Sequence, residues 1–334
     1  MKERSSNPSG NPGRAIVLGG GAAGMTAALA LARRGVRCTV VEKSVRIGGL
    51  PGDLICKGRR VCSDCGVCTV HDRIQAVRSR VDIKIITSAQ IEVLERHGDV
   101  YRATVCIAPE LVDADKCDGC GACLDLCPKG ALGLVPSGNS HGKRAAVDID
   151  LCQKDEGCHV CADACNRGAI DLALDDGSEM LEAETIVVAI GAEPFDPGLD
   201  PRLGHGLIPG VATAREVELG LRCGTWPGGK VPGTVAFIQC VGSRTSKQGT
   251  ALCSKACCKY AFKLATLIRE MVPAAEETFF FMDWRPSDRA DDLLDWARRQ
   301  PKVRAVRSRP AEVVPGPQGP LVRYVKEGDA EVID

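Results

Sequence analysis

Cysteine is the residue type that gives this chain its chemistry. The 334 residues include 19 cysteines, and 16 of these fall into four local groups. The other three, Cys38, Cys106 and Cys223, are expected to be small buried hydrophobic residues. The first residues carry no apolar signal segment, so we expect a reducing cytoplasmic setting. There, grouped cysteines more often bind metal or perform redox chemistry than form disulfides.

Two cysteine runs in the middle of the chain are the most specific of these groups. Cys-x2-Cys-x2-Cys-x3-Cys-Pro begins at Cys117, and a second run with a longer first gap begins at Cys152. In bacterial two-cluster ferredoxins, the fourth cysteine of each run ligates the other cluster. The runs therefore predict a ferredoxin-like α+β domain inserted at 113–175, with a structural zinc site as the alternative. One 4Fe-4S cluster is expected to take Cys117, Cys120, Cys123 and Cys165, and the other Cys152, Cys158, Cys161 and Cys127.

A third group consists of Cys56, Cys62, Cys65 and Cys68. These thiols could ligate a further 4Fe-4S cluster, form a redox dithiol, or be unrelated. Cys56 and Cys62 have five residues between them, whereas the cysteine pair of glutathione-reductase-type enzymes has four. The close spacing of all four thiols favours a metal cluster over the dithiol.

The fourth group consists of Cys240, Cys253, Cys257 and Cys258. Cys253 and Cys257 are four residues apart, so on a helix they would share one face, with Cys258 beside them. One loop thiolate and three helix thiolates could enclose a cluster at the mouth of a sheet; buried thiols are the alternative. Arg244 and Lys255 could offset the negative charge of such a cluster or be ordinary surface charges.

A glycine-rich turn near the start of the chain joins a predicted strand to a predicted helix. The apolar run 15–18 suits a buried parallel strand, and 22–34 suits a helix ended by a glycine. The glycines permit a tight turn and close backbone approach to a pyrophosphate at the helix N-terminus. A second strand, 38–41, ends in an acid that could bind ribose hydroxyls. The residues expected to bind this dinucleotide are Gly19, Gly21, Ala22, Ala23, Gly24, Glu42 and Lys43.

A second glycine pair, Gly48-Gly49, follows this acid closely. The arrangement resembles the two-dinucleotide-binding flavoproteins, which implies that the dinucleotide is FAD. In that superfamily a strand ending near a glycine returns under the FAD, and the apolar stretch 181–190 fits this role. Ala189 and Gly191 are therefore further expected FAD contacts. The predicted fold class is α/β, a Rossmann-like flavoprotein of this type with an inserted α+β ferredoxin domain.

The remaining patterns complete a plan of domains. Strands are expected at 83–87, 91–94, 101–107, 235–239, 278–283, 303–307 and 321–325, and helices at 214–222 and 291–299. The strand at 235–239 should open a second nucleotide-binding domain, but its glycine fingerprint is missing. The expected parts are a disordered leader (1–13), an FAD-binding domain in two parts (14–112 and 176–232) around the insert, and a degenerate second nucleotide-binding-like domain (233–334).

The charge composition gives no indication of a nucleic-acid or membrane partner. Lys plus Arg and Asp plus Glu number 43 each, so the formal net charge is zero. A balanced charge provides no strong field for nucleic acid or an anionic bilayer. The longest apolar runs are also far shorter than a transmembrane helix requires. We expect a soluble protein.

Two segments carry a closer resemblance. Cys-Val-Gly-Ser-Arg at 240–244 and Cys-x3-Cys-Cys-x-Tyr-Ala at 253–261, together with a ferredoxin insert in an FAD domain, resemble the A-type component of heterodisulfide reductases. Cys62-Ser63-x-Cys65 matches that family too. The resemblance implies an unusual 4Fe-4S cluster at the Cys240 group near the flavin. It also implies an electron-transfer oxidoreductase subunit, flavin-based bifurcation or confurcation, and B- and C-type subunits or another electron carrier as partners, in a homodimer or larger complex.

The resemblance is incomplete in three places. The extra N-terminal domain, the C-terminal ferredoxin module and the final strand ending in Gly-Asp have no counterpart here. A partner, a second copy or further residues would then complete the FAD site. The rival interpretation is a self-contained NAD(P)H-dependent FAD disulfide reductase that uses Cys56, Cys62, Cys65 and Cys68.

Overall fold

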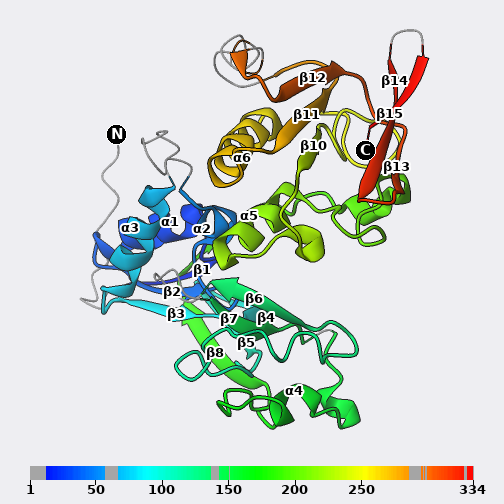
Figure 1. Ribbon diagram of the computed structural model, residues 1–334. Coiled ribbons are helices and arrows are strands. Elements are labelled where there is room, and N and C mark those ends of the chain that lie inside the picture. The colour runs from blue at the N-terminus through cyan, green and yellow to red at the C-terminus, as the bar shows by residue number, and fades with distance from the viewer. Residues whose placement is uncertain are drawn as a thin grey trace, which may run out of the picture. The chain divides into compact units, whose positions relative to one another are not determined.

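The computed structural model describes residues 13–56, 67–136, 143–149, 151–285, 295, 297, 299–326 and 329–333. It divides into two compact units (Figure 1). The first comprises Met1–Leu54 and Gly66–Ala192, and the second comprises Ile55–Cys65 and Glu193–Asp334. The first unit therefore contains both the dinucleotide turn and the ferredoxin-like insert. Residues 193–232, which the sequence assigned to the second part of the FAD-binding domain, fall in the second unit. The predicted leader lies outside the described residues apart from Gly13.

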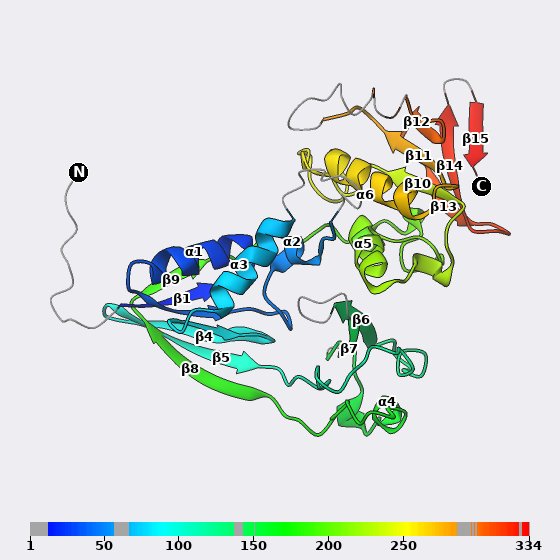
Figure 2. The same ribbon diagram turned by 60° about the vertical axis from the view of Figure 1, so that its left-hand side comes forward.

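A four-stranded parallel sheet in the order β3-β2-β1-β9 organises the first unit. Its strands are β1 (Arg14–Leu18), β2 (Arg37–Val41), β3 (Ile83–Ile86) and β9 (Thr185–Val188). The helices of this unit outside the insert are α1 (Ala22–Ala32), α2 (Gly49–Asp53) and α3 (Cys68–Arg78). Figure 2 shows α1 and α3 together on one face of the sheet.

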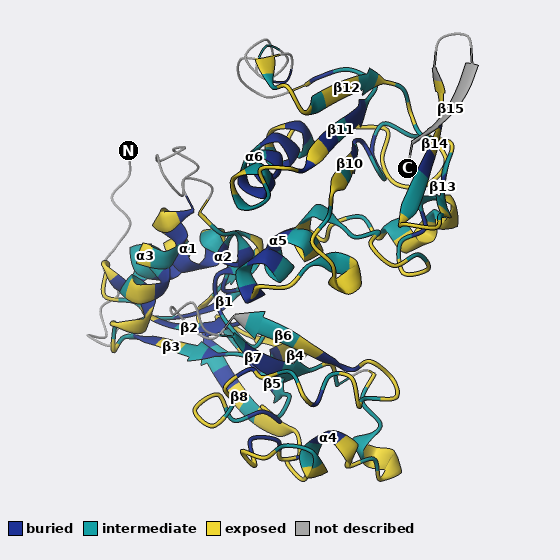
Figure 3. Cartoon of the chain, viewed as in Figure 1, coloured by how far each residue is buried: buried dark blue, intermediate teal, exposed yellow. Residues whose placement is uncertain are grey.

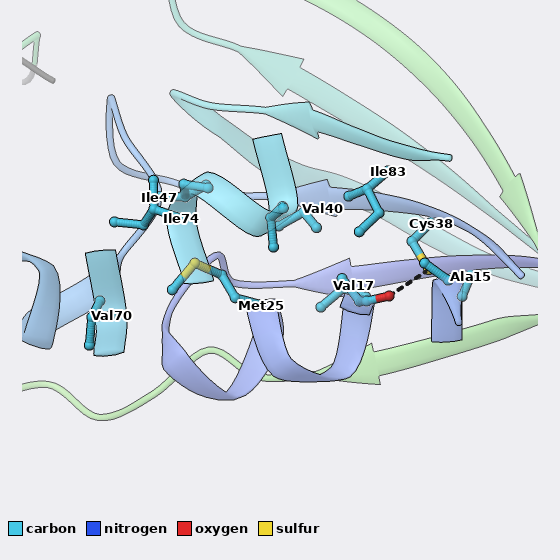
Figure 4. Close-up of a cluster of buried hydrophobic side chains, with 12 residues drawn as sticks. Ala15, Val17, Met25, Cys38, Val40, Ile47, Val70, Ile74 and Ile83 are labelled. Carbon is cyan, nitrogen blue, oxygen red and sulfur yellow. Dashed lines mark hydrogen bonds between the residues drawn. The ribbon is translucent and has the colours of Figure 1, made fainter. Parts of the chain in front are cut away.

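Strand β1 is apolar from Ala15 to Leu18, which suits a strand that is buried on both faces. Val17 points toward α1 and α3, where it joins a cluster with Met25, Val40 and Ile74 (Figure 4). Ile16 points the other way, into a second cluster that includes residues of the antiparallel sheet. A continuous apolar run is therefore the expected sequence for this strand.

The second face of the parallel sheet is covered by an antiparallel sheet, β4-β5-β8. Its strands are β4 (Ala89–His97), β5 (Val100–Ile107) and β8 (Gly177–Ala183). A turn at Gly98 and Asp99 joins β4 to β5. The prediction of one strand over 181–190 was wrong, because the apolar stretch passes at Glu184 from the antiparallel sheet into the parallel one.

The two ends of the inserted module are close together in space. Val112 and Ile170 form an antiparallel bridge, so the two ends of the insert lie side by side. Within it, β6 (Leu132–Pro136) pairs with β7 (Lys143–Val147), and the short helices are η1 (Lys154–Glu156) and α4 (Val160–Asp163). Cysteines Cys123 and Cys161 are part of its small buried core. The module thus has a core built partly of thiols.

The second unit contains a parallel sheet, β10-β11-β12, and an antiparallel sheet, β13-β14-β15. The strands are β10 (Thr234–Ile238), β11 (Glu276–Phe281), β12 (Val303–Arg307), β13 (Glu312–Pro315), β14 (Pro320–Lys326) and β15 (Asp329–Ile333). The helices are α5 (Ala214–Cys223), α6 (Cys257–Met271), η2 (Pro197–Leu199), η3 (Pro201–Leu203) and η4 (Pro227–Gly229). Most of the predicted helix at 291–299 lies outside the described residues.

Aromatic rings hold α6 against the parallel sheet of this unit. Phe279 on β11 stacks on Phe237 of β10 and on Phe262 of α6, with ring centroids 4.6 Å apart in each case. Trp284 packs on Phe262 at 4.8 Å. Figure 3 shows α6 and β11 buried where they meet. This packing fixes the start of α6 near the carboxyl ends of β10 and β11.

In the part of the chain that the structure describes, every helix falls short of the length and apolar character that crossing a bilayer demands.

Candidate cofactor sites

The turn between β1 and α1 has no room for side chains. Gly19 has φ +99°, and a Cβ there would lie 2.4 Å from the carbonyl oxygen of Ala189. A Cβ at Gly24 would lie 1.8 Å from the carbonyl oxygen of Gly19. Both glycines are therefore required, one by the left-handed turn and one by the close approach of helix and turn. Beyond Ala189, Gly191 is exposed with φ +74°.

The glycine pair lies directly against this turn. The N–H of Gly48 donates to the carbonyl of Gly20 at 2.8 Å. A Cβ at Gly49 would lie 2.9 Å from the Cα of Gly21. Helix α1 starts at Ala22 with no side-chain cap and no acidic residue in its first turn. Its first N–H groups therefore face an environment suited to an anion.

Glu42 directly follows β2 and supports the turn. Its side chain is buried, with Oε2 accepting from the N–H of Gly20 at 2.6 Å and Oε1 from the N–H of Ser44 at 2.8 Å. A carboxylate has about four lone-pair sites, so these two bonds leave capacity for a ligand hydroxyl. Lys43 follows with an exposed side chain. The expected contacts of Glu42 and Lys43 with a ribose or FAD remain predictions.

The ferredoxin-like module contains a hollow lined by thiols of both runs. Its walls include the side chains of Pro128, Leu132, Val147 and Val160. The cysteines that line it are Cys127, Cys152, Cys158 and Cys161. The fourth cysteine of the first run thus lies with the first three of the second run, as the crossed ligand pattern requires. In the described residues, no three His, Cys, Asp or Glu converge as ligands of a single metal ion.

The fourth cysteines of the two runs have equivalent surroundings. The Sγ of Cys127 accepts from the N–H of Ala131 at 3.2 Å, and the Sγ of Cys165 accepts from the N–H of Ala169 at 3.4 Å. Burial alone would raise the pKa of Cys127, but N–H groups of the following turn outweigh it and lower that pKa. Backbone donors thus favour the thiolate, which is the form that ligates iron.

The other thiols of the first run gather around Cys123. Burial raises the pKa of Cys123, and repulsion from Cys117 and Cys120 adds to that effect. The Sγ of Cys117 accepts from the N–H of Ala145 at 3.3 Å. Gly119 has φ +68°, and a Cβ there would lie 2.2 Å from the carbonyl oxygen of Lys143. The donor set is therefore compact, thiol-rich and suited to a cluster.

The fourth cysteine group lies at the carboxyl end of β10. Cys240 and Cys258 are buried, and Cys257 is the first residue of α6. The side chains of Cys240 and Cys258 both hydrogen-bond to the Cys257 thiolate and hold its pKa far below its usual range. The pKa of Cys240 is raised, first by that bond and then by burial. The structure therefore brings together three of the four cysteines of this group.

Cys253 is placed differently from the prediction. Helix α6 begins at Cys257, so Cys253 lies in the preceding loop and does not share a helical face with it. The reason is local: Lys255 has φ +58°, and the Oγ of Ser254 accepts from the N–H of Cys257 at 3.4 Å. The Sγ of Cys253 accepts from the N–H of Lys255 at 3.4 Å.

Two buried polar atoms beside this group have no hydrogen-bond partner among the described residues. They are the Oε1 of Gln239, which directly precedes Cys240, and the indole N–H of Trp284, which follows β11. Unpaired polar atoms are costly in a protein interior. Thiols and unpaired polar atoms at one sheet edge fit a bound polar group better than an apolar core.

Sequence reasoning missed two residues that organise this region. Glu218 on α5 is fully buried; its Oε1 accepts from the N–H of Ile55 at 2.7 Å, and its Oε2 accepts from the hydroxyl of Tyr260 at 2.5 Å. These bonds tie α5, α6 and the residue before Cys56 together. The detectable signal was the capping box of Thr213 and Glu216, which marks the start of α5.

The third cysteine group is mostly untested. Cys62 and Cys65 lie outside the described residues, and Cys56 and Cys68 are exposed residues of different units. Their role remains a prediction. Among the ungrouped cysteines, Cys38 and Cys223 are buried as expected, whereas Cys106 is half-buried. The Sγ of Cys38 contacts the carbonyl oxygen of Ala28 at 3.8 Å, as the dashed line in Figure 4 shows.

Two parts of the chain match known domain families. A 4Fe-4S dicluster domain matches residues 116–177, and an NAD(P)-binding Rossmann-like domain matches residues 17–60. These matches coincide with the inserted module and with the β1–α1 turn. Together with the parallel sheet, they confirm the α/β class, the Rossmann-like domain and the ferredoxin-type insert.

Curated relatives match along most of the chain. The A-type iron-sulfur subunit 2 of the CoB–CoM heterodisulfide reductase of Methanopyrus kandleri is 37% identical over 325 residues, covering 91% of this chain and 49% of the relative. The A-type component of the H2:CoB–CoM heterodisulfide,ferredoxin reductase of Methanothermobacter marburgensis is 31% identical over 323 residues, with the same coverage. The chain thus spans about half the length of these relatives. A thioredoxin reductase structure from Lactococcus lactis aligns with 96% of this chain and 74% of its own, with 13% identity and a TM-score of 0.45.

Proposed function

Since this chain is a homologue of the A-type components of heterodisulfide reductases, we propose that it is an FAD and iron-sulfur oxidoreductase subunit that passes electrons between flavin and clusters. This proposal rests on two features that occur together in the first unit. A turn suited to a dinucleotide and a module with four cysteines around a hollow belong to one compact body. Such a body can hold both cofactors.

The residues proposed to hold FAD surround the start of α1. Because Gly19, Gly21 and Gly24 have no side chains, the backbone of the turn can approach the pyrophosphate closely. The N–H groups of Ala22 and Ala23 would face that pyrophosphate. Glu42 would bind the ribose with its remaining acceptor capacity. The additional proposed contacts are Lys43, Gly48, Gly49, Ala189 and Gly191.

The proposed clusters follow the thiol groups. The first cluster takes Cys117, Cys120, Cys123 and Cys165, the second takes Cys127, Cys152, Cys158 and Cys161, and the third takes Cys240, Cys253, Cys257 and Cys258. The group of Cys56, Cys62, Cys65 and Cys68 is proposed to hold a fourth. For the third cluster, the thiol of Cys253 completes the set from the loop before α6.

The two cofactor types would supply complementary chemistry, since FAD exchanges one or two electrons and each 4Fe-4S cluster exchanges one. The protein contributes ligation, burial and hydrogen bonds to sulfur. N–H groups at Ala131, Ala145 and Ala169 already donate to cysteine sulfurs in the insert. Such bonds favour the more negative, reduced state of an iron-sulfur centre.

The partners proposed are the other subunits of a heterodisulfide-reductase-like complex, of B and C type. The relative from Methanothermobacter marburgensis is described by its name as acting on hydrogen, a heterodisulfide and ferredoxin. By analogy, this chain would join or split electron pairs at its flavin. Flavin-based bifurcation or confurcation is the finer form of the proposal.

Anaerobic purification with iron, labile sulfide and flavin analysis tests the proposal. We expect one FAD per chain and about 12 irons for three clusters, or about 16 with a fourth. The variant Cys257→Ala should lose about 4 irons, whereas Cys223→Ala, a buried cysteine outside the groups, should lose none. Protein with neither iron nor flavin would contradict the proposal.

Two assays on the same purified protein distinguish this proposal from a self-contained disulfide reductase. A self-contained disulfide reductase would reduce its flavin rapidly with NAD(P)H and lose activity when the thiols of Cys56, Cys62, Cys65 and Cys68 are alkylated. The electron-transfer subunit should show no direct NAD(P)H turnover.

A further inference from the structure

An arginine and an aspartate meet beside the fourth cysteine group, that of Cys240. Arg244 lies four residues after Cys240, and Asp283 lies two residues after the end of β11. Their side chains form an ion pair, with the arginine 18% and the aspartate 38% exposed. The partly buried pair is therefore less screened by solvent than a surface pair.

The loop holds Arg244 in one place relative to Cys240. The N–H of Ser243 donates to the carbonyl of Cys240 at 3.2 Å, and the N–H of Arg244 donates to the carbonyl of Leu252 at 3.2 Å. Arg244 itself has φ +56°, a conformation that persists only where neighbours enforce it. The guanidinium also hydrogen-bonds to the thiol of Cys240.

Asp283 is connected to the thiol group on both sides. It pairs with Arg244, and its Oδ2 also pairs with Nε of Arg285 at 2.9 Å. The backbone N–H of Arg285 in turn hydrogen-bonds to Cys258. One carboxylate thus fixes two residues, each of which contacts a different cysteine of the group.

Lys255, the other cation considered from sequence, is placed differently. Its side chain is exposed, and its contact with the group is the backbone N–H bond to Cys253. An exposed ammonium is well solvated and acts weakly on a buried centre. Arg244 is therefore the cation whose charge reaches the thiols.

We propose that Asp283 is a positioning residue that holds Arg244 against Cys240, so that the arginine charge favours the reduced state of a cluster bound at the Cys240 group. The inference rests on the proposed function. Reduction adds one negative charge to a cluster, and a fixed cation nearby stabilises that charge most where solvent is excluded. Removing the cation should therefore lower the midpoint potential.

Redox titration followed by electron paramagnetic resonance tests this. The relevant signal is the one present in wild type and lost in Cys257→Ala. At a fixed ambient potential, Arg244→Gln should lower the ratio of reduced to oxidised cluster at least tenfold, which is about 59 mV for one electron. Arg244→Lys, which keeps the charge but loses the planar fork, should lower the ratio less.

Asp283→Glu separates positioning from charge. It keeps the carboxylate but moves it by one methylene, so it should displace the guanidinium and lower the ratio. In the Arg244→Gln background the same change should have a much smaller effect, because only the pairing of Asp283 with Arg285 is then left to alter. Equal effects of Asp283→Glu in both backgrounds would overturn the positioning role.

Two controls complete the design. Arg323→Gln breaks an exposed pair with Glu312 in the same unit, 2.8 Å long, and should leave the ratio unchanged. Iron and sulfide content show whether each variant retains its cluster. Arg244→Gln could lose the cluster and so give no reading. In that case, the inference is overturned if neither Arg244→Lys nor Asp283→Glu changes the ratio of reduced to oxidised cluster. An unchanged ratio in cluster-bearing Arg244→Gln also overturns it. If every paramagnetic resonance signal of the wild type persists in Cys257→Ala, the proposed cluster site is refuted instead.

Discussion

Glu277 should make the stability of the second unit depend on pH. The side chain lies on β11 with 1% of its surface exposed, and neither carboxylate oxygen has a hydrogen-bond partner in the described structure. Burial raises its pKa from 4.5 to about 7, against a smaller opposing attraction from Arg269. The buried carboxylate is therefore unfavourable once it is ionised.

The sign and size of the effect follow from linkage. The folded state keeps the Glu277 proton to a higher pH than the unfolded state, so the protonated carboxyl contributes stability below pH 4.5 that is lost as pH rises toward 7. The full shift corresponds to about 3 kcal/mol. Between pH 5 and pH 8 the wild type should lose about 2.5 kcal/mol of unfolding free energy from this group.

Glu277→Gln should remove that dependence, since glutamine stays neutral. The variant should be more stable than wild type by about 3 kcal/mol at pH 8 and by less than about 1 kcal/mol at pH 5. Denaturant unfolding followed by tryptophan fluorescence measures this unit, because Trp226 and Trp284 belong to it and the sequence has no tryptophan before residue 226. The matched control is Glu276→Gln, an exposed neighbour on the same strand. Parallel pH profiles for wild type and Glu277→Gln would refute the reasoning.

Three further changes have defined outcomes. Gly24→Ala should abolish flavin binding, seen as loss of the yellow absorbance, because its Cβ would lie 1.8 Å from a carbonyl oxygen; Gly13→Ala, with nothing within 4 Å, should not. Tyr260→Phe should destabilise the second unit by about 1.5–3 kcal/mol through the lost bond to Glu218, and unchanged denaturant midpoints would contradict this. Thr213→Ala should cost about 0.5–2 kcal/mol in the same assay, whereas no change would mean that the cap is not used.

Sequence predicted what depends on neighbours along the chain. The β1 turn, Gly24 and the ferredoxin-like insert follow from short spacings whose geometry is set locally. The crossed position of Cys127 could also be expected, since the two runs repeat one pattern. The hollow in the insert agrees with that expectation.

Sequence could not predict what depends on distant contacts. Asp283 and Arg244 are 39 residues apart, and only the parallel pairing of β10 with β11 brings them to one sheet edge. The hydrogen bond between Glu218 and Ile55 likewise joins residues that are 163 positions apart and that only the folded chain brings together. The break at Glu184 was missed because apolar residues continue on both sides of it, while the partners of the two strands differ.

The misplaced Cys253 shows how a local rule fails where backbone conformation is enforced by its surroundings. Of the four non-glycine residues with positive φ in the described chain, Cys240, Arg244 and Lys255 lie within this one segment. Each such residue costs about 1–3 kcal/mol and persists only when its neighbours over-determine it. Helical spacing from 253 to 258 therefore predicted a helix that the left-handed Lys255 interrupts. The strain concentrates where thiols, an ion pair and unpaired polar atoms meet, and a ligand bound there would add the contacts that keep this conformation favourable.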